Sequence, residues 1–208
     1  MINKIIILIL LLLLYYVFLN KEFFDIYEKK INLKGRNNYY TGLSASNSFL
    51  LEENCLKNLK KNYKCICKEK KRNHFPKIVS ITDDKNNSKI KTITMTHQGK
   101  SINKLHKRDI DKIKSKNVNI KEQIQCILKN LIDSKIIHRD MHKSGKNLTI
   151  NEDGDLSLID FNIAYSDNFK PKSSNTKKYI ETSRNENGDL NKNSYIRFFN
   201  ILESKGLI

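Results

Sequence analysis

The sequence contains no tryptophan and no internal repeat, and only four of its 208 residues are cysteines. Nine Tyr and nine Phe partly offset the missing tryptophan, and a hydrophobic content of 38% still permits a packed core. A chain of this length has room for one domain with a small appendage. We therefore expect a single folded unit.

The cysteines lack the spacing of ordinary redox or zinc pairs. Cys65 and Cys67 are separated by one residue, which is too close for a CxxC motif. Cys55 and His74 could be added to them as a metal set, but no second CxxC pair supports one. We expect these thiols and Cys126 to be reduced, in a reducing compartment.

Acidic residues are scarce relative to basic ones. Lys and Arg number 39 against 22 Asp and Glu, so the net charge is 39 − 22 = +17 and the pI is about 9.6. Such a balance suits anionic partners, such as a nucleotide, a nucleic acid or acidic lipid. Lys, Asn and Ile are also abundant along the whole chain, as an AT-rich genome would encode, so a solvated basic surface is the alternative explanation.

The N-terminal segment, residues 1–20, is hydrophobic. Ile5–Leu19 are fifteen consecutive apolar or aromatic residues, which as a helix cover about 22 Å, less than the roughly 30 Å hydrocarbon core of a bilayer. This length fits a signal-peptide core or a short anchor, and a buried core helix is the alternative. No small-x-small cleavage pattern follows, which favours an uncleaved single-pass anchor. Cations concentrate after the run, which places the body on the cytoplasmic side of the membrane (Lys21, Lys29, Lys30, Lys34 and Arg36, against Lys4 before it).

The rest of the chain alternates short strands and amphipathic helices. Apolar residues recur at helical spacing in two segments, and short apolar runs flanked by turn residues predict strands and hairpins. The predicted helices are Phe49–Tyr63, Lys121–Ser134 and a closing turn or two at Tyr195–Leu202, and the predicted strands are Ile31–Lys34, Lys77–Thr82, Lys89–Thr96, Leu148–Ile150 and Leu156–Ile159. Residues 99–119 look basic and loop-like, with short helical potential.

Residues 134–165 combine polar side chains that can bind a cation or move a proton. His138, Arg139 and Asp140 follow a predicted helix and an apolar step, Asn147 precedes the last hairpin, and Asp160 follows it. Carboxylate and amide oxygens are ligands that suit Mg²⁺. Phosphoryl transfer needs metals on the phosphates and a positioned acceptor hydroxyl, and these residue types can supply both.

This order of helix, His-Arg-Asp, Asn, hairpin and Asp-Phe resembles the protein-kinase-like superfamily. The resemblance extends from about residue 49 to 165 and is specific in its last thirty residues. It implies an α+β fold, a truncated two-lobed kinase-like architecture preceded by the hydrophobic N-terminal helix. Residues 21–100 would be a reduced N-lobe with a small antiparallel sheet and a helix, and residues 101–208 a reduced C-lobe with the catalytic loop and a polar tail.

The resemblance also implies roles for the downstream residues, with ATP and Mg²⁺ as cofactors. Asp160 would bind the metal that bridges the phosphates, and Asn147 would bind a second metal. Asp140 would orient the acceptor hydroxyl and accept its proton. Arg139 would brace the catalytic loop, and Lys143 would neutralise the transferred phosphoryl group.

Upstream, the same resemblance implies a strand lysine paired with a helix glutamate to hold the α- and β-phosphates. Lys34 is the predicted lysine, and Glu52 fits the helix register better than Glu53. Met95 would be the gatekeeper, and the nucleotide base would contact the backbone of the hinge residues Thr96, His97 and Gln98.

Four features depart from the family pattern. Asp140 and Asn147 are seven residues apart instead of five, so two residues near Ser144 must bulge outward. Asn162 replaces the usual glycine after Asp-Phe, a change that an Asn backbone tolerates. No Gly-rich loop precedes Lys34. Only 208 − 160 = 48 residues follow Asp160, without an Ala-Pro-Glu motif, so a peptide-docking platform is expected to be reduced or absent.

Three functions stay open on these observations. The first is an active Ser/Thr-type phosphotransferase, whose acceptor could also be a small molecule, because Asp140 and His142 resemble the Asp-x-His of small-molecule kinases. The second is a degenerate pseudokinase that acts as a membrane-tethered scaffold. The third is a basic module that binds nucleic acid or acidic lipid.

Overall fold

The computed structural model describes residues 26–38, 41–64, 67, 72–140, 144–171, 179 and 190–208. The hydrophobic segment predicted at residues 1–20 lies outside these residues. Within the described part of the chain, no helix combines the length and the apolar character needed to cross a bilayer.

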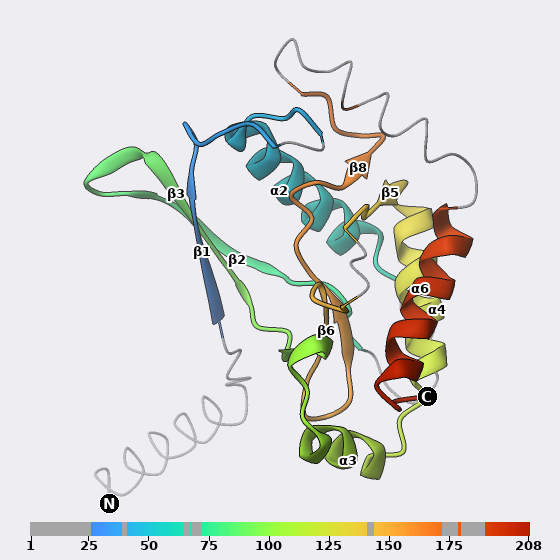
Figure 1. Ribbon diagram of the computed structural model, residues 1–208. Helices are drawn as coiled ribbons and strands as arrows, with labels where there is room; N and C mark the ends of the chain where they lie inside the picture. The colour runs from blue at the N-terminus through green and yellow to red at the C-terminus, as the bar shows by residue number, and fades with distance from the viewer. Residues whose placement is uncertain are drawn as a thin grey trace, which may run out of the picture.

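A three-stranded antiparallel sheet forms the first part of the fold (Figure 1). Its strands are β1 (Ile26–Asn32), β2 (Ile78–Asp84) and β3 (Asn87–Thr96), in the spatial order β1-β3-β2. The predicted β2–β3 hairpin is confirmed. The predicted strand Ile31–Lys34 is wrong in its position, because β1 ends at Asn32 and Lys34 follows in a turn.

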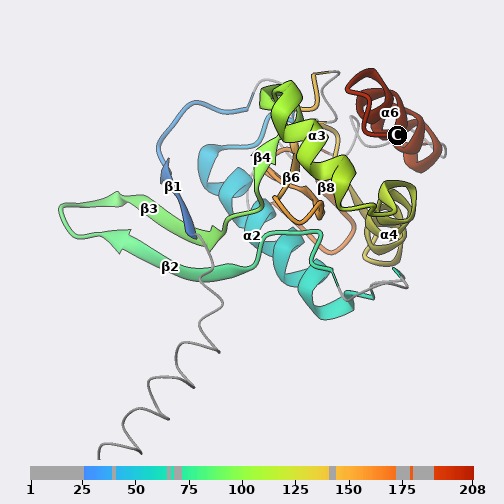
Figure 2. The ribbon, with the colours of Figure 1, turned by 90° about the horizontal axis from the view of Figure 1, so that it is seen from below.

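Helix α2 (Ala45–Asn62) connects β1 to β2 and packs on the sheet (Figures 1 and 2). The Ser44 side chain accepts a hydrogen bond from the Asn47 N–H at 3.2 Å and so caps its first turn. Leu51, Cys55 and Leu59 recur every four residues and are fully buried, as expected for one apolar helix face. The face of α2 that carries Leu51, Cys55 and Leu59 is therefore the one that packs on the rest of the molecule.

The second part is built from short strands and three α-helices. Strands β4 (Lys100–Ser101), β6 (Leu148–Ile150) and β7 (Leu156–Leu158) form one sheet in the order β4-β6-β7, and β5 (Ile136–Ile137) pairs with β8 (Tyr165–Ser166). The helices are α3 (Lys107–Ser115), α4 (Ile120–Asp133) and α6 (Leu190–Ser204), with a single 3-10 turn, η1, at Ile102–Lys104. The predicted α4 and the β6–β7 hairpin are confirmed, whereas the segment expected to be loop-like contains α3.

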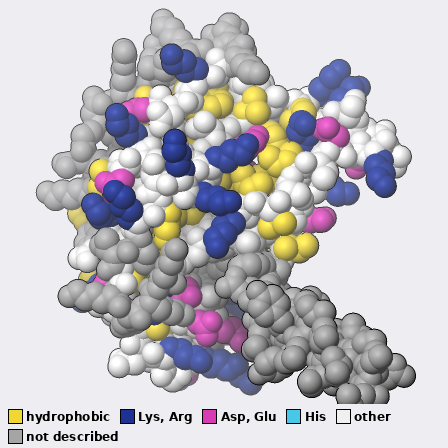
Figure 3. Space-filling model, turned by 180° about the vertical axis from the view of Figure 1, so that it is seen from behind, with side chains coloured by type: hydrophobic (Ala, Val, Ile, Leu, Met, Phe, Trp, Pro, Cys, Tyr) yellow, Lys and Arg dark blue, Asp and Glu magenta, His cyan; other side chains and the backbone are white. Residues whose placement is uncertain are grey.

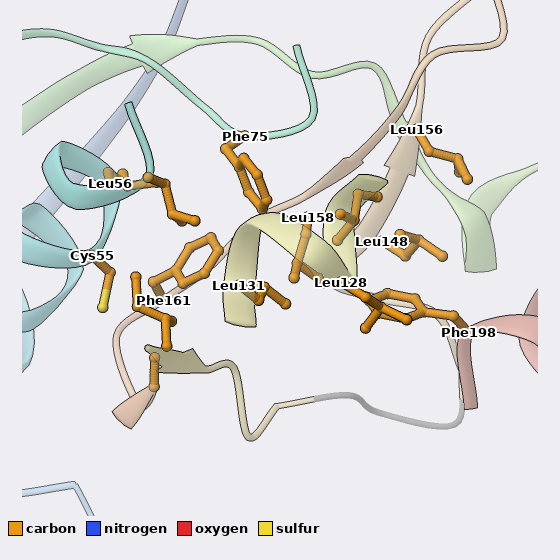
Figure 4. Close-up of a cluster of buried hydrophobic side chains, with 14 of the residues drawn as sticks. Cys55, Leu56, Phe75, Leu128, Leu131, Leu148, Leu156, Leu158, Phe161 and Phe198 are labelled. Atoms are coloured by element: carbon orange, nitrogen blue, oxygen red, sulfur yellow. The ribbon is translucent and has the colours of Figure 1, made fainter. Parts of the chain in front are cut away.

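Helices α4 and α6 lie side by side at the end of the molecule away from the first sheet, as both ribbon views show (Figures 1 and 2). Between α2 and α6 runs one continuous hydrophobic core. Figure 4 shows its side chains from Leu56 and Phe161 across Leu128 and Leu158 to Phe198. The two parts of the fold therefore share one hydrophobic core, and the β6–β7 hairpin lies in its middle.

The core predicts which positions of α4 carry stability. Ile127 is fully buried, whereas Ile132 on the same helix has 49% of its surface exposed. Ile127→Ala should lower the free energy of unfolding by about 2–5 kcal/mol, because it removes buried methylene groups and leaves a cavity. Ile132→Ala is the matched control and should change it by less than about 0.5 kcal/mol. Denaturant unfolding measures both, and equal losses would contradict this description of α4.

Candidate active site

A lysine of the first sheet joins two acidic residues from different parts of the fold. The Lys29 Nζ lies 2.8 Å from Glu52 Oε2 on α2 and 2.9 Å from Asp160 Oδ1, just after β7. The Glu52 side chain is almost completely buried, while those of Lys29 and Asp160 keep 23% and 25% exposure. One cation therefore connects three elements at a place that solvent and small solutes can reach.

The predicted pairing of Glu52 with Lys34 is wrong. Side chains alternate between the two faces of a strand, and the half-buried residues of this segment are Lys29, Ile31 and Leu33. Lys34 has the opposite parity and is exposed beyond the end of β1. In the sequence, the apolar Ile31 and Leu33 already indicated which face of the strand is buried. Because side chains alternate, a lysine on that face must be an even number of residues away from them, as Lys29 is and Lys34 is not.

The neighbouring carboxyl groups keep Lys29 charged. Burial alone would lower the pKa of Lys29, but the attraction of Glu52 and Asp160 outweighs it and raises that pKa to about 12. Burial raises the pKa of Glu52, and the Lys29 ammonium opposes this rise. At neutral pH Lys29 is therefore a fixed positive charge, the type of group that binds a phosphate.

Helix register separates Glu52 from its neighbour. Glu52 is 1% exposed and faces the sheet, whereas Glu53 pairs with Lys57 one turn further along the outer surface of α2. The predicted preference for Glu52 over Glu53 thus matches where the structure places the two side chains. An N-terminal cap and three buried apolar positions fix that register.

The peptide group of Ile159 connects the remaining candidate residues. Its N–H donates to the Asn147 carbonyl at 3.0 Å, and its own carbonyl lies 2.7 Å from the His138 Nε2. His138 directly precedes Arg139 and Asp140, and Ile159 directly precedes Asp160. These two hydrogen bonds bring the three predicted segments together at one end of the β6–β7 hairpin.

The two extra residues between Asp140 and Asn147 do not separate them. The Asn147 Nδ2 donates to the Asp140 carbonyl at 3.0 Å. Gly145 lies within the insertion at φ +72°, and a Cβ there would come within 2.8 Å of the Ile201 side chain on α6. Gly145 therefore lies against α6, and a glycine is required at this position.

The backbone is strained at Arg139, and Asp160 has the same left-handed conformation. Arg139 and Asp160 have φ of +65° and +66°, a left-handed conformation that is uncommon for residues other than Gly, Asn or Asp. Such strain persists only where the surrounding structure imposes it, and it is concentrated at functional sites. Here the Ile159 hydrogen bonds and the burial of Phe161 impose it.

Aromatic side chains pack around Phe161, the residue that follows Asp160. Phe161 is fully buried and makes an edge contact with the His138 ring, with ring centroids 4.8 Å apart, and with Phe75 at 6.1 Å. Burial lowers the pKa of His138, so its ring is neutral at physiological pH. Figure 4 shows Phe161 between Phe75 and Leu56 of α2. Asp160 consequently has a rigid support on the side away from Lys29.

Arg139 contacts two tyrosines that the sequence did not indicate as site residues. Its guanidinium lies 5.3 Å from the centre of the Tyr165 ring and 5.1 Å from that of Tyr179, and its Nη2 donates to the Tyr179 carbonyl at 3.2 Å. The buried Tyr179 hydroxyl accepts from the Ser166 N–H at 3.1 Å. Arg139 thus links Tyr165 and Tyr179, which follow Asp160, to the loop predicted to be catalytic. No spacing pattern in the sequence indicated that two separated tyrosines would contact it.

The predicted hinge residues lie at the end of β3. Met95 and Thr96 are buried, and His97 is exposed. The Thr96 N–H donates to the Lys77 carbonyl at 3.0 Å, so any backbone contact with a base must come from His97 or Gln98. Gln98 in turn accepts from the Ser157 hydroxyl at 2.8 Å, which joins the hinge to β7.

The donors present fit a hard divalent cation. Asp160 supplies a carboxylate with one quarter of its surface exposed. The Asn147 amide nitrogen is used by Asp140, which leaves its Oδ1 as the ligating atom. Oxygen donors of this kind would hold Mg²⁺. Lys143, the predicted group for the transferred phosphate, lies outside the described residues.

The Lys29 cluster yields a stability prediction. Lys29→Met should cost roughly 3 kcal/mol of unfolding free energy, because it leaves the buried Glu52 carboxylate without its cation. Lys34→Met is the matched control and should cost less than about 0.5 kcal/mol. Adding Glu52→Gln to Lys29→Met should recover part of the loss. Equal losses from the two lysine variants in denaturant unfolding would contradict the assignment of Lys29.

Comparison with known proteins completes the description of this site. No curated protein matches the chain. A chain in the crystal structure of the yeast RNA Pol II CTD kinase CTDK-1 complex is 20% identical, with a TM-score of 0.41, and the match covers 69% of this chain and 40% of that one. Residues 23–186, most of the chain, match the family described as the ABC1 atypical kinase-like domain, which agrees with the predicted kinase-like superfamily. The chain belongs to the ABC1 atypical kinase-like domain family.

Proposed function

We propose that this protein is a Mg²⁺- and ATP-dependent phosphotransferase that moves the γ-phosphate to a hydroxyl group. The observation that carries the proposal is the joint contact of Lys29 with Glu52 and Asp160. Phosphoryl transfer requires a lysine on the phosphates and an acidic residue on the metal at the same time. The cluster supports both roles in one place.

Each residue then has a defined task. Lys29 binds α- and β-phosphate oxygens, and Glu52 holds its ammonium in position. Asp160 and Asn147 hold Mg²⁺, which when bound neutralises the phosphate charge and aligns the γ-phosphate. Asp140, held to Asn147 through its carbonyl, orients the acceptor hydroxyl and accepts its proton. Met95 and the hinge around His97 and Gln98 receive the base.

The acceptor is a Ser or Thr hydroxyl of a protein, with a small-molecule hydroxyl as the other candidate. The order Asp140-Met141-His142 supports a small acceptor, because it resembles the Asp-x-His of small-molecule kinases. Phosphorylation assays with a protein substrate and with small alcohols, side by side, separate the two.

Asp160→Asn tests the proposal. The change keeps the shape of the side chain but removes the metal-binding charge, and should lower the rate of Mg·ATP-dependent phosphate transfer by at least about a hundredfold. Asp153→Asn, at an exposed turn of the β6–β7 hairpin, is the matched control and should leave the rate unchanged. Thermal unfolding shows that both variants remain folded. Equal transfer by the Asp160 variant and its parent would reject the proposed function.

The same assay distinguishes the other two functions. A protein that is stabilised by ATP but transfers no phosphate would be a degenerate pseudokinase, in line with the insertion before Asn147 and the missing Gly-rich loop. Salt-sensitive binding of nucleic acid that ATP does not affect would indicate the basic module. On the face that Figure 3 shows, Lys and Arg side chains lie among hydrophobic and uncharged ones.

Membrane attachment through residues 1–20 remains part of the proposal, with the body on the cytoplasmic side. It rests on the hydrophobic run Ile5–Leu19 and on the cations that follow it. Protease digestion of intact membranes should cut the body from the cytoplasmic side. Protection of the body, or glycosylation at Asn86, would contradict this orientation.

A further inference from the structure

Three side chains that could bind a metal lie close together beside α4. The Cys67 Sγ, the His74 Nε2 and the Cys126 Sγ all lie within 4.8 Å of one another, and the first two are 3.6 Å apart. His74 and Cys126 are fully buried, and Cys67 is half-buried. The three residues come from the segment after α2 and from the second turn of α4, and none belongs to the candidate active site.

The His74 ring is oriented as in a metal ligand. Its Nδ1 lies 2.6 Å from the Leu156 carbonyl on β7. A carbonyl can only accept, so the ring proton is on Nδ1, and the lone pair of Nε2 points toward the Cys67 sulfur. Metal-binding histidines are typically held by such a hydrogen bond from the other ring nitrogen to a carbonyl.

Cys126 lies beside Asn130. The Asn130 Nδ2 donates to the Lys64 carbonyl at 2.9 Å and to the Cys126 carbonyl at 2.8 Å, and it lies 3.6 Å from the Cys126 Sγ. The Lys64 N–H donates to the Asn130 Oδ1 at 2.7 Å, and the Cys126 Sγ lies 3.9 Å from the Lys64 carbonyl. The same asparagine fixes the chain just before Cys67 against α4, so both sulfurs are positioned from one residue.

We propose that Cys67, His74 and Cys126 form a structural Zn²⁺ site. Thiolate and imidazole ligands in this combination favour zinc. With Zn–S and Zn–N bonds of about 2.3 and 2.1 Å, tetrahedral geometry places sulfur and nitrogen about 3.6 Å apart, which matches the 3.6 Å between Cys67 and His74. The fourth position is left to water.

Proton balance follows from the ligand states. Each cysteine thiol loses its proton to solvent when the sulfur binds the metal, whereas His74 binds through a lone pair and releases none. Two protons are therefore released for each Zn²⁺ bound, and no redox change takes place.

The site would tie the segment after α2 to α4 and β7. Phe75 directly follows His74 and contacts Phe161, whose neighbour is Asp160. Zinc would therefore fix the contact between Phe75 and Phe161 next to Asp160. The site itself does not depend on phosphate transfer, because its ligands and their partners stand apart from the Lys29 cluster.

Zinc analysis of the full-length chain, purified in detergent without chelator, tests the inference. The wild-type chain should carry about one Zn²⁺, and Co²⁺ exchanged into it should show thiolate-to-metal charge-transfer absorption. Cys67→Ser, at the half-buried ligand, should weaken Zn²⁺ binding by more than the about 10–100-fold cost of losing an outer-shell partner. Cys55→Ala is the matched control and should keep full zinc content, because Cys55 lies outside the cluster.

A second measurement uses the wild-type chain alone, so that it tests the site even where the variants fold poorly. Removing the metal from the wild-type chain with a chelator should lower its melting temperature, and adding Zn²⁺ should restore it. A wild-type chain that neither contains nor takes up Zn²⁺ under reducing conditions overturns the inference. So does a Co²⁺ complex without the thiolate band, or one whose band keeps its full intensity in Cys67→Ser, where only the Cys126 thiolate would remain.

Discussion

The ion pair between Lys29 and Glu52 is the interaction on which the arrangement of the site depends. Glu52 is almost completely buried on α2, and a buried carboxylate is costly unless a cation compensates it. Lys29 supplies that cation from β1 and reaches Asp160 as well. The position of α2 relative to the sheet and the position of the segment after β7 are therefore linked through a single ammonium group.

The β6–β7 hairpin gives this cluster a rigid base. Its end residue Ile159 is hydrogen-bonded to His138 on one side and to Asn147 on the other, and Phe161 is buried directly after it. Because these bonds use backbone groups, they hold whatever the side chain of residue 159 is. The Asn147 side chain in turn reaches the Asp140 carbonyl despite the two extra residues between them.

Contacts around Arg139 show how a reduced fold orders the segment after Asp160. The guanidinium is placed over the Tyr165 and Tyr179 rings, where cation–π attraction and a hydrogen bond act together. Burial raises the pKa of Tyr179, so its hydroxyl stays neutral and continues to accept from Ser166. Tyr165 and Tyr179 are thus held by one charged guanidinium and by the hydrogen bond to the neutral Tyr179 hydroxyl.

Much of the fold and of the site could be predicted from local sequence patterns. Helical spacing in α4, the hairpin turn between β6 and β7, and the run from His138 to Asp160 each depend on residues close in the chain, so short-range rules suffice. The lysine was missed because the prediction matched Ile31–Lys34 to the form of the family's strand motif and ignored strand parity. Tyr179 was missed because its contact with Arg139 crosses forty residues.

The sequence by itself determined the helices, the hairpins, the family motif and the excess of positive charge. Only the tertiary structure decided that Lys29 meets Glu52 and Asp160, and that Cys126 joins Cys67 and His74 from a helix more than fifty residues away. The physical reason is that periodicity and turn chemistry act over a few residues, whereas the partner of a buried charge or thiol is set by how separate elements pack.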